Sequence, residues 1–391
     1  MSSYPLSATR RRPAAGRPAP RLADTLSDAA TDVKRVPAHF ASPEPPPASQ
    51  PSTPASQLPF AASTPTPLSW LAEADRYWAF LLWVVVIGIG LWPPLLYPLY
   101  LLFHPSWIGL ARLGALYAFV AACLLCPLAE PPPAWGRSLC TYILTRTAAM
   151  LRFRAVYEDG GALVPGTPYV VACEPHSTLP MGMVLGLNTC TGTPPPGLAG
   201  VRILASSACF SVPLVRQVWW WNGMRPASRG TMQSLLAGST PVALCPGGVR
   251  EVGLLTPGGG TETLYLRART GFVRLALQAR APLVPAFAFG QTAAFEWVRP
   301  PMPRAAHECL ARAIGFMPLW VHDGRGLPFP RRDAGVTLVV GKPLPLPAFD
   351  GADPPPELVA ATLDAYIAAL TALFERHKAE QGCGGTRLVV M

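Results

Sequence analysis

Residues 169–177, YVVACEPHS, decide the fold class of this chain. The first five residues suit a buried strand, and the Glu-Pro-His-Ser that follows marks the point where a strand gives way to a loop. Comparable β-rich runs and helical stretches alternate downstream, with runs at 201–204, 242–244, 283–289 and 336–340 and helices at 271–280 and 358–378. This alternation predicts an α/β domain, a sheet flanked by helices, with function in the loops at the strand ends.

Ahead of this domain the chain is strongly apolar. Residues 77–103 carry no charge, which is long enough for a bilayer that needs about 20 residues. After His104-Pro105-Ser106 a second apolar stretch runs over 107–128. Two helices joined by so short a turn predict a membrane hairpin with both chain ends on one side, and the arginines that follow place that side in the cytosol. A re-entrant wedge is an open alternative, because Pro93 and Pro94 fall mid-run, and a buried soluble hairpin is another.

The domain boundaries follow from these changes in composition. Residues 1–67 hold 14 of the 48 prolines and little apolar periodicity, which predicts a disordered tail. Its first 23 residues carry five arginines and no acid, so an organelle transit peptide and a basic cytosolic tail are both open. We expect the membrane hairpin over 68–130, the α/β domain over 131–382 and a short C-terminal tail over 383–391.

The composition also excludes classes of protein. The 391 residues are 50% hydrophobic and only 14% charged, which rules out a wholly disordered chain or a coiled coil. The net charge of +10 comes from scattered arginines without a nucleic-acid motif, so an anionic membrane face is expected and nucleic acid is not. Nine cysteines at irregular spacing suggest neither a disulfide framework nor a metal site.

The catalytic inventory of the α/β domain is short. His176 is the only histidine between His104 and His307, and the only carboxylates from 160 to 295 are Glu174, Glu251 and Glu262. His176 is therefore the natural base near neutral pH, with a structural histidine as the alternative. No serine elbow, phosphate loop or zinc-protease motif is present. A histidine base without a nucleophile suits direct attack by a substrate hydroxyl on an activated acyl group.

Two further segments could contact a ligand. Cys245 to Glu251 follow a strand, and the paired Gly247 and Gly248 could present N–H groups to an oxyanion, with Arg250 beside the turn. Residues 267–272 begin a helix. Arginines are unfavourable at a helix N-terminus, so a bound anion would stabilise them there. An ordinary strand-to-helix turn and a solvated basic face are the respective alternatives.

Several ordered blocks resemble the type-2 diacylglycerol acyltransferase family, which includes monoacylglycerol and wax-alcohol acyltransferases. Residues 269–290, RTGFVRLALQARAPLVPAFAFG, resemble its diagnostic segment. Residues 174–177 resemble its His-Pro-His-Gly block in the Glu-Pro-His-Ser form of plant and algal members, and 247–251 resemble its Gly-Gly-x-x-Glu block. Further matches are VHDGRG at 321–326, VTLVVGKP at 336–343 and LFERHK at 373–378, so that with the hairpin the resemblance covers about residues 70–380.

The resemblance implies a glycerolipid-acyltransferase-like α/β domain that forms triacylglycerol from acyl-CoA and diacylglycerol. His176 would deprotonate the acceptor hydroxyl, Glu174 or Glu251 would orient its imidazole, and Gly247 and Gly248 would supply oxyanion donors. The other matched residues expected at the substrate are Pro175, Ser177, Arg250, Arg269, Gly271 and Phe272. No metal or redox cofactor is implied, since acyl-CoA is a co-substrate. The implied location is the endoplasmic reticulum membrane with lipid-droplet association, or the plastid envelope, among membrane lipid and with a homo-oligomer left open.

Other readings stay open at this point. The acceptor could be a monoacylglycerol, a long-chain alcohol or phytol, and a non-catalytic lipid-droplet or membrane-shaping protein is the alternative of another class. A lysophospholipid acyltransferase is disfavoured because Met181 stands where those enzymes carry an aspartate. Asp323 separates His322 from Gly324, which argues against a catalytic role for His322. Residues 219–221, three tryptophans, are either an interfacial anchor or part of the core.

Overall fold

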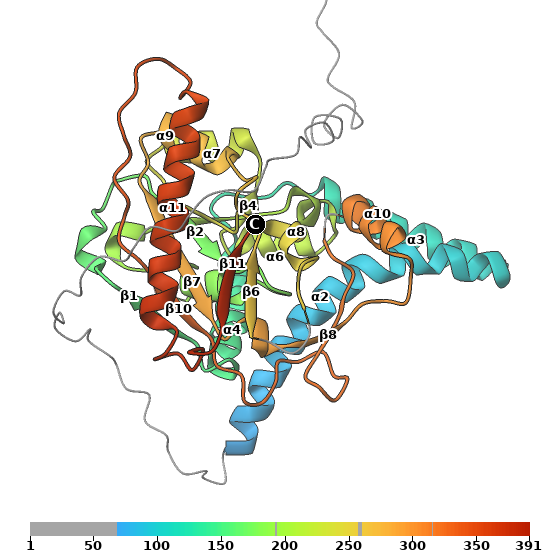
Figure 1. Ribbon diagram of the computed structural model, residues 1–391. Coiled ribbons are helices and arrows are strands. Elements are labelled where there is room, and N and C mark those ends of the chain that lie inside the picture. The colour runs from blue at the N-terminus through green and yellow to red at the C-terminus, as the bar shows by residue number, and fades with distance from the viewer. Residues whose placement is uncertain (1–68, 192–193, 257–259, 315) are drawn as a thin grey trace, which may run out of the picture. The chain divides into compact units, whose positions relative to one another are not determined.

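The computed structural model describes residues 69–191, 194–256, 260–314 and 316–391 (Figure 1). The expected N-terminal tail over 1–67 lies outside these ranges. All of the described residues belong to one compact unit.

A seven-stranded sheet forms the centre of the α/β domain, in the order β1-β10-β7-β2-β5-β3-β4. Its strands are β1 (Arg154–Tyr157), β2 (Val170–Glu174), β3 (Arg202–Ala205), β4 (Arg225–Pro226), β5 (Val242–Leu244), β7 (Leu283–Phe289) and β10 (Thr337–Val340). Strand β10 runs antiparallel to β7, so β1 and β10 oppose the other five strands. The five β-rich runs expected from the sequence are all strands of this sheet.

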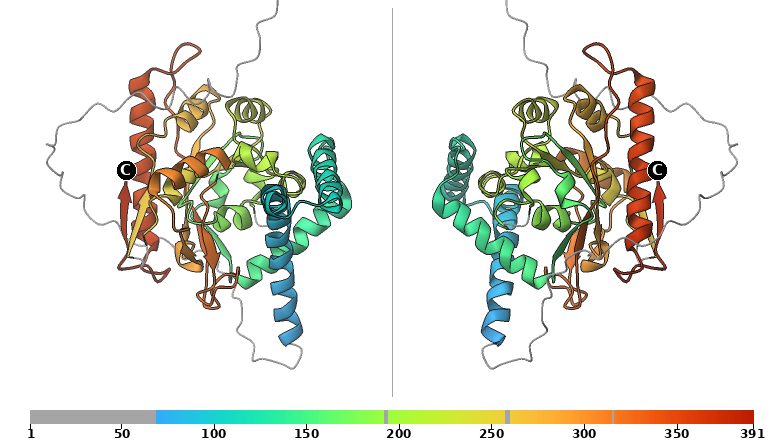
Figure 2. Two further views of the ribbon diagram at one scale, coloured as in Figure 1. Left: turned by 90° about the vertical axis from the view of Figure 1, so that its right-hand side faces the viewer. Right: turned by 90° about the vertical axis from the view of Figure 1, so that its left-hand side faces the viewer.

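Helices cover both faces of the sheet because successive strand residues point to opposite sides. Val170 and Ala172 face one core, which contains side chains of α7, α9 and α11, and Val171 and Cys173 face the other, which contains side chains of α5. These helices are α5 (Met181–Gly186), α7 (Arg229–Ala237), α9 (Gly271–Gln278) and α11 (Pro356–His377). Figure 2 shows α11 and α4 (Ala134–Met150) on opposite sides of the sheet.

The predicted hairpin is formed by α2 (Ser69–Phe103) and α3 (Trp107–Leu125). Its antiparallel pairing is shown by the Tyr117 hydroxyl, which donates to the Pro94 carbonyl oxygen at 3.0 Å. Pro93, Pro94 and Pro98 lie inside α2 without ending it. Among the residues that the structure describes, three helices are apolar and long enough to cross a membrane: these two and α11. Helix α11 owes that composition to packing, since Leu363, Leu370 and Phe374 are buried against the sheet.

The first half of α2 is packed against the α/β domain. Phe80 is buried and contacts the rings of Phe295 and Phe329, while Asp75 accepts the Tyr142 hydroxyl at 2.5 Å and pairs with Arg146 of α4 at 2.5 Å. Exposed large apolar side chains nevertheless occur along the whole of α2, from Trp70 and Trp78 to Leu102 and Phe103, and continue onto α3 at Trp107, Ile108 and Leu110. So large an exposed apolar surface marks contact with a membrane.

The end of α3 is also fixed to the domain. The Arg216 guanidinium, on α6 (Val215–Trp221), donates to the carbonyl oxygens of Cys123, Leu124 and Cys126 at 3.0, 2.5 and 3.0 Å. A cation placed there satisfies free carbonyls and opposes the negative end of the helix dipole. The three tryptophans of α6 extend this attachment: Trp219 stacks on Trp83, Trp220 donates to the Ala129 carbonyl, and Trp221 packs edge-on against Trp135. The tryptophans therefore pack between elements.

Two small sheets complete the domain. Strand β8 (Glu296–Val298) pairs with β9 (Trp320–His322), and β6 (Thr261–Leu264) pairs in parallel with β11 (Arg387–Val390). The segment 383–391, set apart as a tail by the sequence, thus contributes a strand beside β6. The remaining described helices are α8 (Gly248–Val252) and α10 (Arg304–Ile314).

Candidate active site

The candidate site lies where three neighbouring parallel strands end. Strand β2 stands between β7 and β5 and runs parallel to both, with Glu174 opposite Phe287 and Ala172 opposite Leu244. Their carboxyl ends therefore share one edge of the sheet, the place where open α/β sheets bind ligands. The segment after β2 brings Glu174 to Ser177, the segment after β5 brings Gly247 to Glu251, and the segment after β7 brings Gln291.

His176 is held by its backbone and by one ring nitrogen. Its backbone N–H donates to Glu251 Oε1 at 2.5 Å, and its Nδ1 lies 3.0 Å from the Ser177 carbonyl oxygen. A carbonyl only accepts, so Nδ1 must carry the proton and Nε2 must carry the lone pair. Within the described ranges no group is bonded to Nε2. The arrangement leaves a base nitrogen available in the tautomer that proton abstraction requires.

The electrostatics of His176 favour the neutral ring. Burial lowers the pKa of the imidazole below its ordinary value of 6.5, since a low-dielectric surrounding disfavours the charged form. The backbone carbonyl of Ser177 works in the opposite direction and offsets part of that shift. His176 is consequently unprotonated at neutral pH and can accept a proton.

Neither candidate carboxylate is hydrogen-bonded to the imidazole. Glu251, 1% exposed, accepts the backbone N–H groups of His176 and Tyr265, the latter at 3.1 Å. Glu174, 0% exposed, accepts the Gly247 N–H at 3.1 Å. The role of orienting the ring, expected for one of the two, is filled in this structure by the Ser177 carbonyl, and the carboxylates hold the loops together.

The two carboxyl groups titrate as a pair. Burial raises the pKa of Glu174 well above its usual range, and the charge of Glu251 raises it further. Burial also raises the pKa of Glu251, to about 7, although its two backbone donors lower it. Because Glu251 has these donors and Arg269 nearby, it is the member that ionises first.

The two glycines after β5 are required for different reasons. A Cβ on Gly247 would overlap the Glu251 carboxylate, so this position must be glycine for Glu251 to reach His176. Gly248 has a φ of +56°, in the left-handed region that glycine tolerates best. The Gly247 N–H is already donated to Glu174, whereas the Gly248 N–H at the start of α8 has no partner among the described residues. Of the two expected oxyanion donors, Gly248 is the one still available.

Two of the expected arginines reach this loop. Arg269 Nη2 donates to the Gly247 carbonyl at 3.0 Å, and Arg250 Nη1 donates to the Tyr265 hydroxyl at 3.0 Å. Both guanidinium groups lie near the Tyr265 ring, at 5.2 and 5.7 Å from its centroid. They place positive charge next to the glycine turn, where it could stabilise an anionic group.

Gly271 and Phe272 are placed differently from the expectation. Phe272 is buried in the core and contacts the Tyr366 ring edge-on at 5.4 Å, so packing accounts for it. Gly271 is exposed at the start of α9, and a Cβ there would meet no atom within 4 Å. Nothing in the described structure brings either residue to His176.

Gln291 belongs to the site although no motif indicated it. It is 1% exposed; its Oε1 accepts the Gly182 N–H at 2.6 Å and its Nε2 donates to the Pro175 carbonyl at 2.5 Å. Its only signal in the sequence is its position, directly after the apolar strand 283–289 and Gly290. Gln291 therefore fixes the backbone just before His176, while Glu251 fixes the N–H of His176 itself.

Several buried polar atoms at this edge have no partner within the described ranges: Glu174 Oε2, Ser177 Oγ, Thr178 Oγ1 and Arg269 Nε. Leaving such groups unpaired costs about 1–3 kcal/mol each.

Pro175 and Ser177 contribute to the site through their carbonyls, which accept from Gln291 and from the His176 ring respectively. Ser177 has a φ of +54°, which turns its carbonyl back toward that ring.

Residues outside this edge have other functions in the fold. Met181 is buried at the start of α5, and His322 Nδ1 accepts the Gly324 N–H at 3.0 Å within the turn after β9. Among the described residues, no group of three or more histidine, cysteine or acidic side chains could hold a metal ion.

Comparison with known proteins identifies the family. A family model described as diacylglycerol acyltransferase matches residues 153–391. Human diacylglycerol O-acyltransferase 2-like protein 6 is 29% identical over 349 residues, which covers 81% of this chain and 96% of that one. The mouse protein of the same name is 32% identical over 57% of this chain and 70% of its own. Mouse acyl-CoA wax alcohol acyltransferase 1 is 32% identical over 58% and 72% of the two chains.

A solved structure is also similar. The 1-acyl-sn-glycerophosphate acyltransferase of Thermotoga maritima is 12% identical, with a TM-score of 0.36, over 78% of this chain and 95% of that chain.

Proposed function

Because the chain belongs to the diacylglycerol acyltransferase family, we propose that it transfers an acyl group from acyl-CoA to the free hydroxyl of diacylglycerol, forming triacylglycerol. Acyl transfer is the activity named for its relatives. The observation that carries the proposal is the state of His176: a neutral ring, with Nδ1 bonded to the Ser177 carbonyl and Nε2 carrying the lone pair at the carboxyl edge of the sheet.

The reaction follows from that geometry. Nε2 of His176 takes the proton of the acceptor hydroxyl as its oxygen attacks the thioester carbonyl carbon. The tetrahedral intermediate then collapses, the C–S bond breaks, and the leaving thiolate takes the proton from the imidazolium to give free CoA. General-base assistance of this kind contributes typically ~10²–10⁴-fold.

Charge that develops on the thioester oxygen needs donors. The Gly248 N–H is the candidate, since the Gly247 N–H is held by Glu174. The guanidinium groups of Arg269 and Arg250 add positive charge beside the same turn. Preorganised donors aimed at a developing oxyanion typically contribute several kcal/mol to such reactions.

The location of the acceptor supports a membrane reaction. The exposed apolar side chains of α2 and α3 would enter the bilayer, where diacylglycerol is dissolved. The endoplasmic reticulum membrane with its lipid droplets is the proposed compartment. The same hairpin would be the working part of a non-catalytic membrane-shaping protein, but such a protein has no use for a base poised at the sheet edge.

A long-chain alcohol is the second candidate acceptor. Relatives named wax alcohol acyltransferases, at 31–32% identity, are as similar to this chain as those named diacylglycerol O-acyltransferase 2-like, at 29–32%. The chemistry at His176 is the same for either hydroxyl.

The test is transfer of labelled acyl-CoA into lipid classes, in membranes of cells that make no neutral lipid and express the full chain. Diacylglycerol, monoacylglycerol and a long-chain alcohol are offered in parallel. We expect triacylglycerol from the wild type, and a His176→Ala variant slowed by ~10²-fold or more. His104→Ala, at the hairpin turn, is the matched control. Equal product from wild type and His176→Ala would exclude His176 as the base, and product from the alcohol alone would select the second acceptor.

A further inference from the structure

A second charged site lies away from the sheet edge. A pocket of about 310 Å³ is lined by Asp323, Gly324, Arg325, Arg331, Arg332 and Asp333, which we call the arginine pocket. It lies in the segment between β9 and β10, where Phe329 contacts Tyr77 and Phe80 of α2. Apart from Gly324, every lining residue is charged, so the pocket does not suit an acyl chain.

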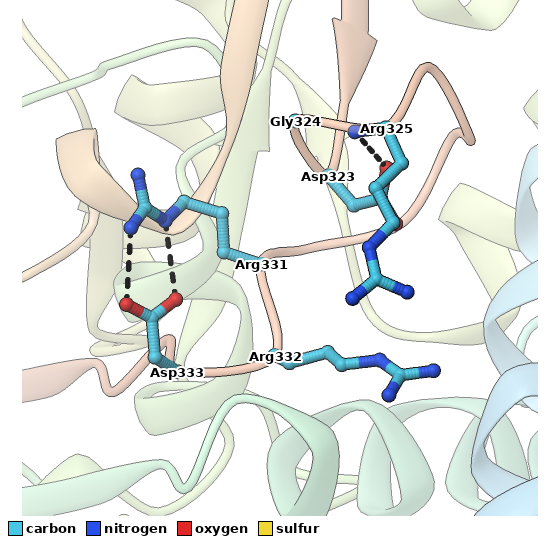
Figure 3. A pocket seen from close by; sticks show the side chains of 6 residues that line it. All are labelled: Asp323, Gly324, Arg325, Arg331, Arg332 and Asp333. Carbon is cyan, nitrogen blue, oxygen red and sulfur yellow. Dashed lines mark hydrogen bonds and ion pairs between the residues drawn. The ribbon is translucent and has the colours of Figure 1, made fainter.

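The carboxylates of the arginine pocket are already engaged. Asp333 accepts from both Nε and Nη2 of Arg331, at 3.1 and 3.0 Å (Figure 3). Arg331 Nη1 also pairs with Glu296 at 2.8 Å. Asp323 Oδ1 accepts the backbone N–H groups of Arg325 and Leu327, at 2.8 and 3.2 Å. Arg331 is thus neutralised by two carboxylates, and Asp323 is used to shape the turn.

The other two guanidinium groups of the arginine pocket belong to Arg325 and Arg332. Figure 3 shows the side chain of Arg325 extending toward that of Arg332, which itself extends toward α2, while Arg331 turns the other way to Asp333. No hydrogen bond or ion pair links either guanidinium to a residue within the described ranges. Arg152 adds a third positive charge, since its Nη2 donates to the Arg332 carbonyl at 3.3 Å.

We propose that the arginine pocket binds the phosphate group of an anionic ligand through Arg325 and Arg332. The planar guanidinium presents paired N–H donors that match phosphate oxygens, and two such groups on one side of a polar hollow can engage one phosphate together. The volume suits a phosphorylated head group or nucleotide portion, since pockets for whole drug-sized ligands start at about 300 Å³. The proposal does not depend on which acceptor the enzyme acylates.

Two sources of phosphate share this chemistry, a soluble phosphate ester and an anionic phospholipid. The experiment measures binding of one probe for each source to the full chain, which is purified in a maltoside detergent that carries no phosphate. One arm titrates adenosine 3′,5′-bisphosphate by calorimetry. The other follows the gain in flotation when phosphatidic acid is added to phosphatidylcholine vesicles, so that binding by the hairpin alone is subtracted.

The variants separate the pocket from general basicity. We compare Arg325→Ala/Arg332→Ala with Arg229→Ala/Arg274→Ala, which removes the same charge from α7 and α9, at an exposed arginine and at one that pairs with Asp353. Neither guanidinium is bonded to a residue within the described ranges, so the pocket variant should fold. We expect it to weaken binding of at least one probe by about tenfold per guanidinium, with Arg325→Lys/Arg332→Lys in between and the control unchanged.

Each outcome shows whether the arginine pocket binds phosphate and from which source. Loss for the bisphosphate alone assigns a soluble phosphate ester, loss for the vesicles alone assigns a phospholipid head group, and loss for both assigns a general phosphate site. Absence of binding of both probes by the wild type, or equal losses in the pocket and control variants, would overturn the proposal. Because no arm requires turnover, failure here is distinct from failure of the proposed acyltransfer.

Discussion

Glu251 binds the backbone of His176 and not its ring. Glu251 Oε1 lies 2.5 Å from the backbone nitrogen of His176, while the ring Nδ1 donates to the Ser177 carbonyl. His176 is therefore held by a carboxylate at its backbone N–H and by a main-chain carbonyl at its ring. Its basicity depends on burial and on one neutral carbonyl, and this has a measurable consequence for pH.

The pH profile of kcat/KM should report a depressed histidine. Catalysis needs neutral His176, and burial keeps its pKa below 6.5, so activity should fall only as the pH drops through an inflection below 6.5 and stay level above it. Initial rates across the pH range check this, with the residual activity of His176→Ala as the control that lacks the inflection. A wild-type inflection above pH 7 would contradict the assignment.

Removing the amide of Gln291 should displace His176 without touching substrate. Gln291→Leu keeps the size of the side chain but loses the bonds to Gly182 and Pro175. We expect kcat to fall by about 10–100-fold, with a much smaller change in KM for acyl-CoA, since an error of about 1 Å in placing a catalytic group can cost ~10²-fold. Gln278→Leu, at a glutamine that bonds to Asp353, is the matched control. A change confined to KM would mean that Gln291 binds substrate instead.

Gly247 and Gly271, both expected at the substrate from the sequence, should respond differently to substitution by alanine. Gly247→Ala places a methyl group on the Glu251 carboxylate and should release His176, with loss of most activity. Gly271→Ala meets open space at the start of α9 and should be neutral or stabilise the protein by about 0.4–1 kcal/mol. Activity and thermal unfolding of the two variants check this, and equal effects would show that the overlap at Gly247 is relieved by a shift of α8.

Arg216 should be needed to hold the hairpin on the domain. Arg216→Ala removes the donor to three carbonyls at the end of α3 and should cost about 1–3 kcal/mol. Limited proteolysis after α3, in detergent, should then proceed faster than in the wild type. Arg112→Ala removes the same charge from the exposed surface of α3 and should leave the rate unchanged; similar acceleration by both would point to charge alone.

Glu262 should destabilise the protein as the pH rises. Burial raises the pKa of Glu262 to about 7, so between its unfolded value of 4.5 and 7 the folded chain binds more protons than the unfolded chain. Stability from this group is present at low pH and is lost as the pH rises through that window. Glu262→Gln can still accept from Thr292 and should raise the Tm at pH 8 more than at pH 5. An equal gain at both values would mean that the charge is not involved.

The sequence predicted the elements whose signals are local. The hairpin follows from uninterrupted apolarity, the five strands of the main sheet from β-rich runs, and His176 from the scarcity of titratable groups. The contact of Glu251 with the His176 backbone is not local, because it depends on β5 lying beside β2. Gln291 was missed for the same reason: it follows β7 and reaches Pro175 only through the pairing of β7 with β2. Phe272 was misassigned because a residue beside an arginine turn can equally face the core.

The pairing of β11 with β6 has a consequence for biosynthesis. Strand β6 leads directly to Tyr265, whose N–H holds Glu251, and β6 gains its partner only when residues 387–390 have emerged from the ribosome. The hairpin, at residues 69–125, is synthesised long before. Chains fold from the N-terminus onward during synthesis. The hairpin can thus reach its membrane while β6, which leads to the Tyr265 N–H that Glu251 accepts, still lacks its partner strand.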